Sequence, residues 1–503
     1  MRASPAALVA AFVTLSLVTR ALLLVAPPLS DEPVHLVGTS VLQHGGRLYL
    51  DFVDNKPPLL YAYYAVAQLA FGAGLAAVRW LTVLLWIPLT ALAASAYYGH
   101  RPAGVVAGAL YVIAGASFVI DEGLAVNTEV LMLLPAALAF VSVARSGERP
   151  WWRAFAAGAW LGVAALFKVT AVLWLPAIPL MAWRVADREA KLWATVRGAV
   201  AALAGLSLPL VAVAMVFQAQ GTLGEWFEWS VLRNFGYVTA RVEAAEALKR
   251  AATGAIGWTV ATWPLWWAAW RPSQRPGEDD GRWLARVLAL LAIPAVVMGY
   301  RFFAHYYLQV LLPLCLAAAP AVATWVEGPT NRLARASLAW VAIALAAFTA
   351  LNAWILFGRN DVLEGRRAVY ADVASWMGAD KCAEPRTLFV WGREPMFYVA
   401  SGLRPASRFV LPQETLSGYV PGRESTSAAG RVAEDTGFDW DTLMADLERS
   451  RASYVIDTAP SGLHGWGVYK LWNYPRLFLY LREHYDQAAV IDRVVVYRRK
   501  DCR

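Results

Sequence analysis

The chain has 503 residues, of which 58% are hydrophobic and only 16% are charged, and its mean hydropathy is +0.44. Soluble domains carry about 25% charged residues, so this composition excludes an ordinary soluble protein and predicts an integral membrane protein. The net charge of +8 does not indicate nucleic-acid binding, because the arginines lie in short loops between apolar segments and form no basic stripe with interleaved aromatic residues.

Hydropathy predicts about eleven membrane-spanning helices, with two of them, around Lys168, short enough to be read instead as one long helix. We interpret the first span as a retained helix, because no small-residue cleavage site precedes Asp31. The apolar segment 59–71 is short and begins after Pro57-Pro58, so we expect it to lie in the outer interface without crossing. The predicted spans are 6–26, 77–97, 103–120, 128–144, 154–167, 169–183, 196–217, 252–270, 284–299, 306–325 and 336–357.

The distribution of lysine and arginine predicts the orientation of these helices. With the N-terminus inside, the inner loops hold more basic residues than the outer loops, although the outer loops are longer. This orientation brings Asp31, Asp121 and His305 to the outer side. We therefore expect a multi-pass membrane protein, with residues 1–357 forming its transmembrane domain.

Residues 358–503 have a different periodicity and predict a small α/β domain on the periplasmic side. Cys382 and Cys502 lie near its two ends, and a disulfide between them is allowed in that compartment, but two cysteines cannot be paired from sequence alone. Cys315 lies in an apolar span and is expected to be a core residue. The expected helices are 361–377, a short helix that follows a turn at Gly392 and ends at Ala400, 439–450 and 474–484. The expected strands are 387–391, 454–456 and a pair within 488–497 broken near Asp492.

The polar stretch after the first span carries the first candidate site. Asp31-Glu32 follows the span directly, and Asp54-Asn55-Lys56 precedes Pro57-Pro58, which fixes the direction of the preceding side chains. A carboxylate at the membrane rim can accept the proton of an acceptor hydroxyl, and lysine is a compact phosphate binder. We predict that Asp31, assisted by Glu32, is catalytic, that Lys56 binds a phosphate and that Asp54 assists the acceptor. The alternatives are a solvated acidic pair and a lysine that extends to the interface.

The second outer loop adds Asp121, Glu122 and Glu129. These carboxylates can assist Asp31, orient an acceptor or bind Mg²⁺ or Mn²⁺, which prefer oxygen ligands. Helix capping and simple solvation are the alternatives. Zinc is not expected, because the sequence has no cluster of histidine and cysteine.

Two further polar positions interrupt apolar sequence. Lys168 is costly in such a run unless it reaches the interface or a phosphate. Arg301 and His305 begin a span at the outer rim and can bind phosphate, with Tyr306 beside them for the acceptor. A turn between two short helices at Lys168, and an aromatic belt with one anchoring arginine, are the alternatives.

These motifs together resemble those of GT-C fold glycosyltransferases. The resemblance rests on the acidic pair, the Gly-Gly-x-Leu-Tyr-x-Asp and Asp-Asn-Lys-Pro-Pro-Leu-Leu-Tyr runs, the Asn-Thr-Glu loop, Lys168 and the start of the span at His305. It is strongest to the bacterial branch related to protein O-mannosyltransferases, lipid A aminoarabinose transferases and lipopolysaccharide core galacturonosyltransferases. It covers nearly the whole membrane part.

The resemblance implies a polyprenyl-phosphate-linked sugar donor, a periplasmic site and an inverting transfer, with Asp31 as the base and Lys56 as a phosphate contact. Membrane lipids and an envelope glycan, lipid or protein acceptor are the expected partners, and no cofactor beyond a possible divalent metal is implied. The alternatives are a flippase for a lipid-linked sugar, which needs inverted repeats and broken midplane helices that we do not find, and a scaffold whose outer domain does the work.

Overall fold

A computed structural model describes residues 4–29, 31–118, 124–144, 150–239, 242–271, 278–328, 332–358, 360–380, 382, 386–412, 414–420 and 433–502. The chain divides into two compact units. We call the first the helical unit, with residues 1–32, 56–223 and 244–358, and the second the sheet unit, with residues 33–55, 224–243 and 359–503. Two short segments from the first 243 residues therefore join the C-terminal region.

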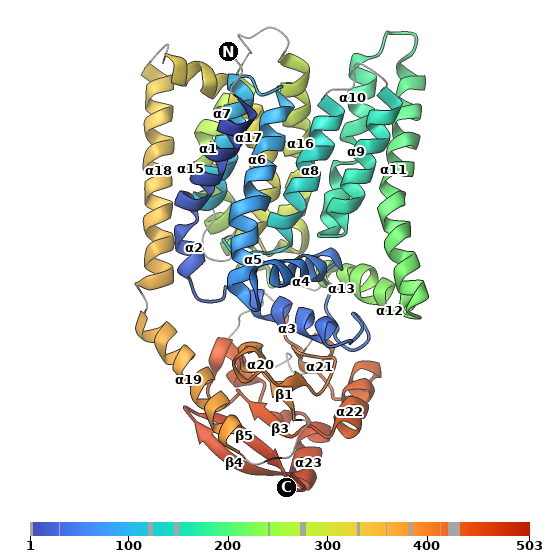
Figure 1. Cartoon of the computed structure of the whole chain (residues 1–503), viewed down its shortest axis with the longest axis vertical. Coiled ribbons are helices and arrows are strands. Elements are labelled where there is room, and N and C mark those ends of the chain that lie inside the picture. Colours follow the sequence, from blue (N-terminus) through green and yellow to red (C-terminus); the bar gives the residue numbers. More distant parts are fainter. Residues whose placement is uncertain are drawn as a thin grey trace. The chain divides into compact units, whose positions relative to one another are not determined.

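Most helices of the helical unit run side by side, whereas α4 (Leu59–Phe71) lies across their direction (Figure 1). Several are continuous across a short change of helical type, marked η. Its elements are α1 (Pro5–Thr19), α2 (Ala21–Val25), α4 (Leu59–Phe71), α5 (Leu75–Leu81), η1 (Thr82–Trp86), α6 (Ile87–Tyr97), α7 (Pro102–Ser117), α8 (Thr128–Ala144), α9 (Pro150–Ala165), η3 (Val169–Trp174), α10 (Ala177–Val185), α11 (Lys191–Ala219), α14 (Ala244–Arg250), η5 (Ala251–Ile256), α15 (Gly257–Trp270), α16 (Asp279–Val297), η6 (Met298–Tyr300), η7 (Ala304–Tyr307), α17 (Leu308–Glu327) and α18 (Arg332–Phe357).

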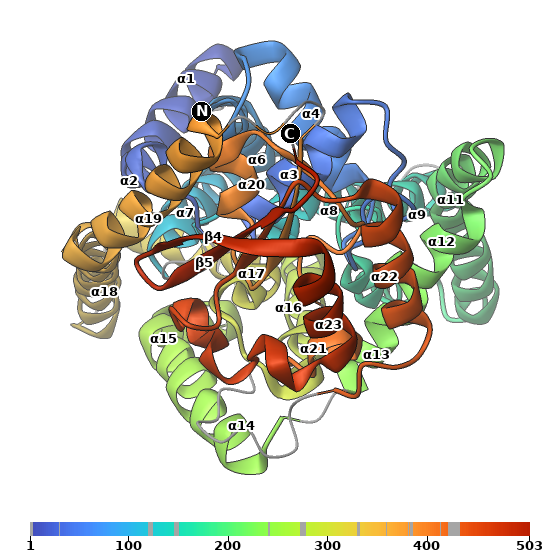
Figure 2. The ribbon, with the colours of Figure 1, turned by 90° about the horizontal axis from the view of Figure 1, so that it is seen from below.

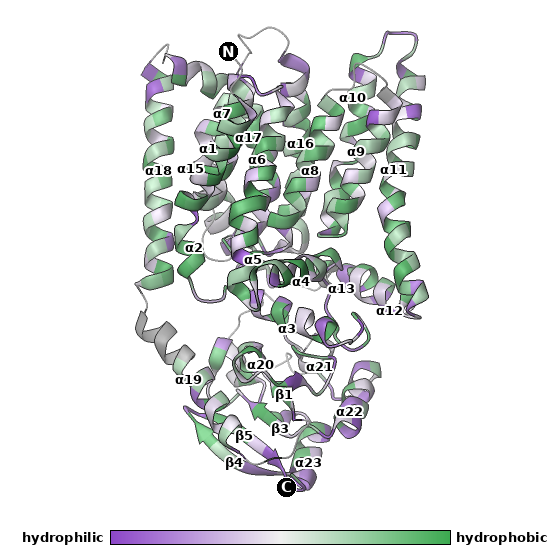
Figure 3. Ribbon diagram, viewed as in Figure 1, coloured by the Kyte–Doolittle hydropathy of each residue, from purple (hydrophilic) through white to green (hydrophobic). Residues whose placement is uncertain are grey.

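Within the described residues, five helices are long and apolar enough to cross a membrane, and five shorter apolar helices accompany them. Apolar residues extend along α11 and α18 (Figure 3), and most residues of these two helices are not buried within the unit, as expected of lipid-facing surfaces. The five long helices are Leu75–Tyr97, Lys191–Ala219, Asp279–Tyr300, Ala304–Glu327 and Arg332–Phe357. A multi-pass membrane protein is thereby supported, while the count of eleven crossings stays a prediction.

The first predicted span is wrong in one respect, because 6–26 is not a single helix. The chain departs from helical geometry at Arg20, which separates α1 from α2. The Arg20 guanidinium is buried and donates a hydrogen bond to the carbonyl oxygen of Val112 at 2.9 Å. Hydropathy does not detect a break of this kind, since the arginine is satisfied by a helix distant in sequence.

The ambiguity around Lys168 is resolved in favour of two elements. Lys168 has extended backbone angles, φ −152° and ψ 120°, and lies between α9 and η3. The two predicted segments are therefore separate helices, and Lys168 lies at the break between them.

The sheet unit contains a five-stranded sheet in the order β2-β1-β3-β5-β4, in which β1 pairs parallel with β2 and β3 while β5 pairs antiparallel with β3 and β4. The predicted mixture of helices and strands in this region is confirmed, and strand 387–391 has the predicted bounds. Its elements are α3 (Glu32–Gln43), α12 (Leu223–Phe227), η4 (Glu228–Leu232), α13 (Arg233–Thr239), α19 (Asn360–Ala379), β1 (Thr387–Trp391), α20 (Met396–Ser401), β2 (Arg404–Pro405), α21 (Glu414–Ser417), α22 (Phe438–Ser450), β3 (Tyr454–Asp457), η8 (Leu463–Val468), η9 (Leu471–Asn473), α23 (Pro475–His484), β4 (Tyr485–Ile491) and β5 (Val494–Arg499).

Helices cover both faces of this sheet (Figure 2). Tyr454 contacts Trp376 of α19, with ring centroids 6.2 Å apart. Trp391, which faces the other way by strand alternation, packs against Trp440 of α22 and next to Tyr474 at the start of α23. The aromatic residues thus fill the core on the α22 and α23 side.

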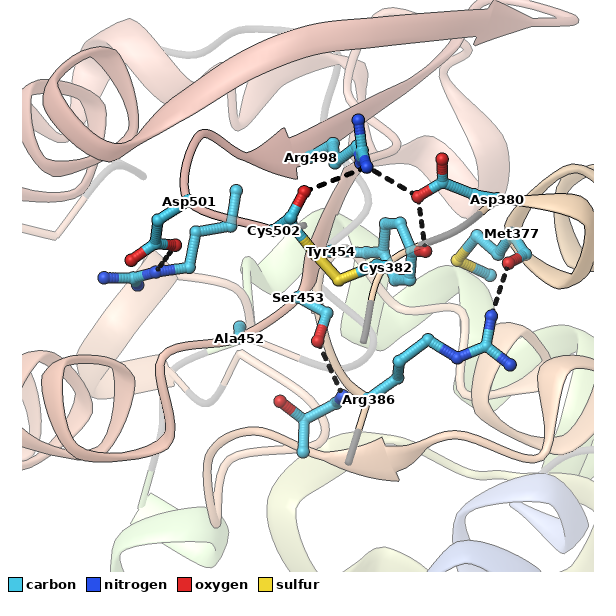
Figure 4. Close-up of a disulfide and its surroundings, with 12 residues drawn as sticks. Met377, Asp380, Cys382, Arg386, Ala452, Ser453, Tyr454, Arg498, Asp501 and Cys502 are labelled. Carbon is cyan, nitrogen blue, oxygen red and sulfur yellow. Dashed lines mark hydrogen bonds and ion pairs between the residues drawn. A yellow bond between two sulfur atoms is a disulfide. The ribbon is translucent and has the colours of Figure 1, made fainter. Parts of the chain in front are cut away.

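A disulfide joins Cys382 to Cys502 across 120 residues of sequence (Figure 4), a pairing that the sequence left open. Around it, Arg498 forms an ion pair with Asp380 at 2.9 Å, and the hydroxyl of Tyr454 donates to the same carboxylate at 2.7 Å. The crosslink and these contacts fix the C-terminal end of the chain to the segment after α19.

Asp457 lies at the end of β3, and its carboxyl should make the free energy of unfolding depend on pH. Burial raises the pKa of its carboxyl from 3.8 to about 7, while a hydrogen bond from the Ala459 amide lowers it in part. Between these two values the folded state keeps a proton that the unfolded chain releases, so the free energy of unfolding falls as the pH rises, by up to about 4 kcal/mol. The penalty is absent below pH 4 and constant above pH 7.

Asp457→Asn keeps an acceptor for the Ala459 amide and removes the ionisable group. We expect this variant to be more stable than the wild type above pH 7 and to lose the slope between pH 4 and 7. Thermal unfolding of the full chain in detergent, followed by tryptophan fluorescence from pH 4 to 8, measures both. Equal slopes in the two proteins would show that Asp457 ionises freely in the fold.

Candidate active site

The two residues predicted as base and phosphate contact form an ion pair in the helical unit. The ammonium of Lys56 lies 3.4 Å from Oδ2 of Asp31, and the side chains are 27% and 45% exposed. Asp31 lies between α2 and the first residue of α3, and Lys56 precedes the two prolines that lead into α4. The pair is therefore fixed by two helix starts and remains accessible to a ligand.

A second cluster forms around Glu129, in the first turn of α8. Its buried carboxylate lies 2.5 Å from the ammonium of Lys168 and 3.6 Å from Nε2 of His305, and it accepts a hydrogen bond from the Thr128 hydroxyl. The Lys168 ammonium also lies over the ring of Tyr306, 4.8 Å from its centroid. Four of the predicted site residues, from three separate helix starts, are thus brought together.

Two hydrogen bonds donated by backbone amides link the two clusters. The amide of Leu59, three residues after Lys56, donates to the carbonyl of Leu166, two residues before Lys168, at 3.1 Å. The amide of Val126, three residues before Glu129, donates to the carboxylate of Glu32 at 3.0 Å. The hydrogen-bonded residues are close in sequence to the residues of the two clusters, so these hydrogen bonds hold the clusters near each other.

Glu32 differs from its neighbour Asp31, because its carboxylate is buried and fully engaged. It pairs with the guanidinium of Arg79 at 2.6 Å and accepts hydrogen bonds from the amides of Leu29 and Val126. Arg79 also donates to the carbonyls of Leu23, Ala26 and Pro27 at the end of α2. These contacts hold the segment that carries Asp31 in place.

Sequence reasoning missed Arg79. The signal that identifies it is a lone arginine inside the apolar span 77–97, which is costly at membrane depth unless it is paired. The same signal identifies Arg20 in the first span.

Arg301 is buried in a segment with unusual backbone geometry. Tyr300 and Phe302, on either side of it, have φ of 54° and 49°, in the left-handed region that non-glycine residues rarely adopt. The ring of Phe303 stacks on His305, with centroids 5.6 Å apart. Strained backbone of this kind is concentrated at functional sites, and here it leads directly into the Glu129 cluster.

Asp54 belongs to the sheet unit, where it is buried and accepts a hydrogen bond from the Asn55 amide at 2.7 Å. Asp121 and Glu122 lie outside the described residues.

The described residues do not fit a divalent metal. No group of three or more histidine, cysteine, aspartate or glutamate residues in that part of the chain can hold a metal ion. The chemistry of the site agrees, because Asp31 and Glu129 each face a lysine ammonium.

No family model and no curated protein sequence matches the chain. Its fold is similar to that of ArnT from Cupriavidus metallidurans bound to undecaprenyl phosphate, with a TM-score of 0.60, 15% identity and coverage of 98% of each chain. The apo state of the same protein gives a TM-score of 0.56, 16% identity and 97% coverage of each chain.

A more distant match is AglB, the archaeal oligosaccharyltransferase from Archaeoglobus fulgidus, in complex with an inhibitory peptide and a dolichol-phosphate. It has a TM-score of 0.46 and 12% identity, over 95% of this chain and 72% of AglB. ArnT and AglB are GT-C fold glycosyltransferases. The likeness to ArnT extends over nearly all of both chains and shows that this chain has the GT-C fold predicted from its motifs.

Proposed function

We propose that this chain is an integral membrane glycosyltransferase that moves a hexosyl or pentosyl group from a polyprenyl-phosphate donor to an envelope acceptor at the periplasmic face of a bacterial inner membrane. The acceptor is lipid A or lipopolysaccharide, another glycan, or a protein. The observation that carries the proposal is the accessible pair of Asp31 and Lys56. The fold supports it, since ArnT, of similar fold, was crystallised with undecaprenyl phosphate.

The reaction requires one bond to form and one to break. The acceptor oxygen attacks the anomeric carbon while the bond from that carbon to the phosphate oxygen breaks. The polyprenyl phosphate leaves with the electron pair, and the acceptor proton passes to Asp31. Attack opposite the leaving group inverts the anomeric centre.

Lys56 has two partners in this scheme. Its ammonium pairs with Asp31 at 3.4 Å. The phosphate of the donor competes for the same ammonium and stabilises there the charge that develops on the leaving group. Asp31 is then released from its ion pair and is a stronger proton acceptor, so donor binding prepares the base.

The Glu129 cluster supplies a second lysine ammonium, which is held in place by its partners. Glu129 and the Tyr306 ring hold the ammonium of Lys168, so it loses little conformational freedom when it contacts a phosphate. His305 lies beside it and can donate a hydrogen bond to the phosphate or the sugar. Glu32 and Arg79 act through Asp31, by fixing the segment that carries it.

The proposal is tested with purified full-length protein, a radiolabelled polyprenyl-phosphate sugar and an envelope acceptor fraction. Each new glycosidic bond should be accompanied by one released polyprenyl phosphate. Movement of the donor across a vesicle membrane without a new glycosidic bond would instead identify a flippase. Mass spectrometry of envelope lipids and glycans from a deletion strain then identifies the acceptor.

A further inference from the structure

A second candidate site lies in the sheet unit, at the carboxyl ends of the parallel strands β1 and β3. In open α/β sheets, ligands bind in the crevice outside the carboxyl ends of the strands. The loops that follow these two strands touch each other, since a Cβ atom on Gly392 would lie only 2.1 Å from Oγ1 of Thr458. The first loop contributes Arg393 and Glu394, and the second contributes His464.

Glu394 orients the His464 side chain. Its carboxylate is 1% exposed and is hydrogen-bonded to the Tyr370 hydroxyl and to Nδ1 of His464, whereas the His464 side chain is 42% exposed. A buried carboxylate that contacts one ring nitrogen fixes the imidazole orientation, so the outer edge of the ring is held in a defined position.

Arg393 is stacked on an aromatic ring and has no carboxylate partner among the described residues. Its guanidinium lies 4.1 Å from the ring centroid of Tyr419, which in turn lies 6.0 Å from the rings of Trp466 and Tyr469. Other arginines of this unit are paired with aspartates, namely Arg233 with Asp439, Arg408 with Asp446 and Arg498 with Asp380. A stacked guanidinium keeps its edge donors available for bidentate binding of a carboxylate or phosphate.

The loop that carries His464 has a constrained backbone. His464 has φ of 45°, while the glycines at 462 and 465 have φ of 67° and 74°. A non-glycine residue in this region costs free energy that the surrounding contacts must offset, and such residues are concentrated at ligand-binding sites. The contact of His464 to Glu394 helps to offset this cost.

We propose that Arg393 and His464, supported by Tyr419 and Glu394, bind an anionic sugar. Arg393 binds the carboxylate or phosphate, and His464 hydrogen-bonds the sugar hydroxyls. That this sugar is part of the acceptor rests on the proposed transferase function. That the site binds an anionic sugar does not depend on that function. Its residues belong to the sheet unit, whereas Asp31 and Lys56 belong to the helical unit.

The test measures binding of small probes to the full chain in nanodiscs by ligand-observed NMR titration. The probes are glucuronic acid, glucose 6-phosphate, glucose and inorganic phosphate. We expect the wild type to bind the first two more tightly than glucose. Arg393→Gln should weaken the binding of both by about tenfold or more, the value of a charged hydrogen-bonded contact.

The matched control is Arg482→Gln, because Arg482 is an exposed arginine of α23 whose guanidinium also lies over a ring, that of Phe478, at 5.9 Å. It should bind the probes like the wild type. If Arg393→Gln does not fold, Arg393→Lys provides the same test, since it keeps the charge but loses the planar fork.

Three results would overturn the inference. They are equal binding of glucose and the charged sugars, equal binding of inorganic phosphate and glucose 6-phosphate, and unchanged binding in Arg393→Gln. Failure of the transferase proposal looks different, because the chain would then bind these probes without forming any glycosidic bond. Sugar transfer by a chain that does not bind the probes would contradict the anionic-sugar site and leave the transferase proposal in place.

Discussion

Asp31→Asn is expected to lower the rate of sugar transfer by about 10²- to 10⁴-fold, the range for loss of a general base. Asparagine has nearly the same shape but cannot accept the proton of the acceptor hydroxyl near neutral pH. Because the Asp31–Lys56 pair is partly exposed, its loss should change stability little. Donor binding should be retained, since the phosphate contact of Lys56 remains. Single-turnover transfer with saturating donor isolates the chemical step.

Asp51→Asn provides the matched control. Asp51 lies in the same polar stretch, its side chain is also 45% exposed, and it also pairs with a cation, Arg47, at 3.5 Å. Its substitution should leave transfer within about twofold of the wild type, because loss of an exposed ion pair has little effect. Wild-type turnover in Asp31→Asn would remove Asp31 from the mechanism.

Arg79→Leu is expected to destabilise the helical unit by about 3–5 kcal/mol, because removal of one partner leaves the other charge buried without compensation. The carboxylate of Glu32 would keep only the hydrogen bonds from backbone amides. Three carbonyls at the end of α2 would lose the hydrogen bonds that the Arg79 guanidinium donates. Thermal unfolding in detergent should show a lower midpoint for this variant.

The double variant Arg79→Leu, Glu32→Leu separates the charge effect from the loss of packing. If the uncompensated carboxylate causes the loss, removal of both charges should recover part of the stability of the single variant. A double variant less stable than Arg79→Leu would show that Glu32 stabilises the fold through its amide contacts alone.

The sequence predicted local elements well where their patterns are self-contained. The apolar run 59–71 after two prolines and the buried strand 387–391 have the bounds that the structure shows. The break at Arg20 was missed because it depends on a carbonyl of α7. Inclusion of residues 33–55 and 224–243 in the sheet unit is likewise a property of tertiary packing.

For the site, sequence alone selected the polar residues but not their partners. Asp31 and Glu32 are adjacent acidic residues, and the sequence does not distinguish which of them is the base. In the structure Asp31 is accessible beside Lys56, whereas Glu32 is buried against Arg79. Which of the two faces the ligand depends on where α3 begins. The grouping of Glu129, Lys168 and His305 depends on three helix starts far apart in the sequence, which no local pattern relates.

The central claim, that the Asp31–Lys56 pair is the site of donor binding, is tested most directly by the donor affinity of Lys56→Gln. The control is Lys249→Gln, which removes a positive charge whose side chain is 71% exposed. We expect Lys56→Gln to bind a polyprenyl-phosphate sugar about 10- to 100-fold more weakly than the wild type, the value of a charged hydrogen bond to phosphate, and Lys249→Gln to bind it normally. Equal donor affinity in Lys56→Gln and the wild type would contradict the account.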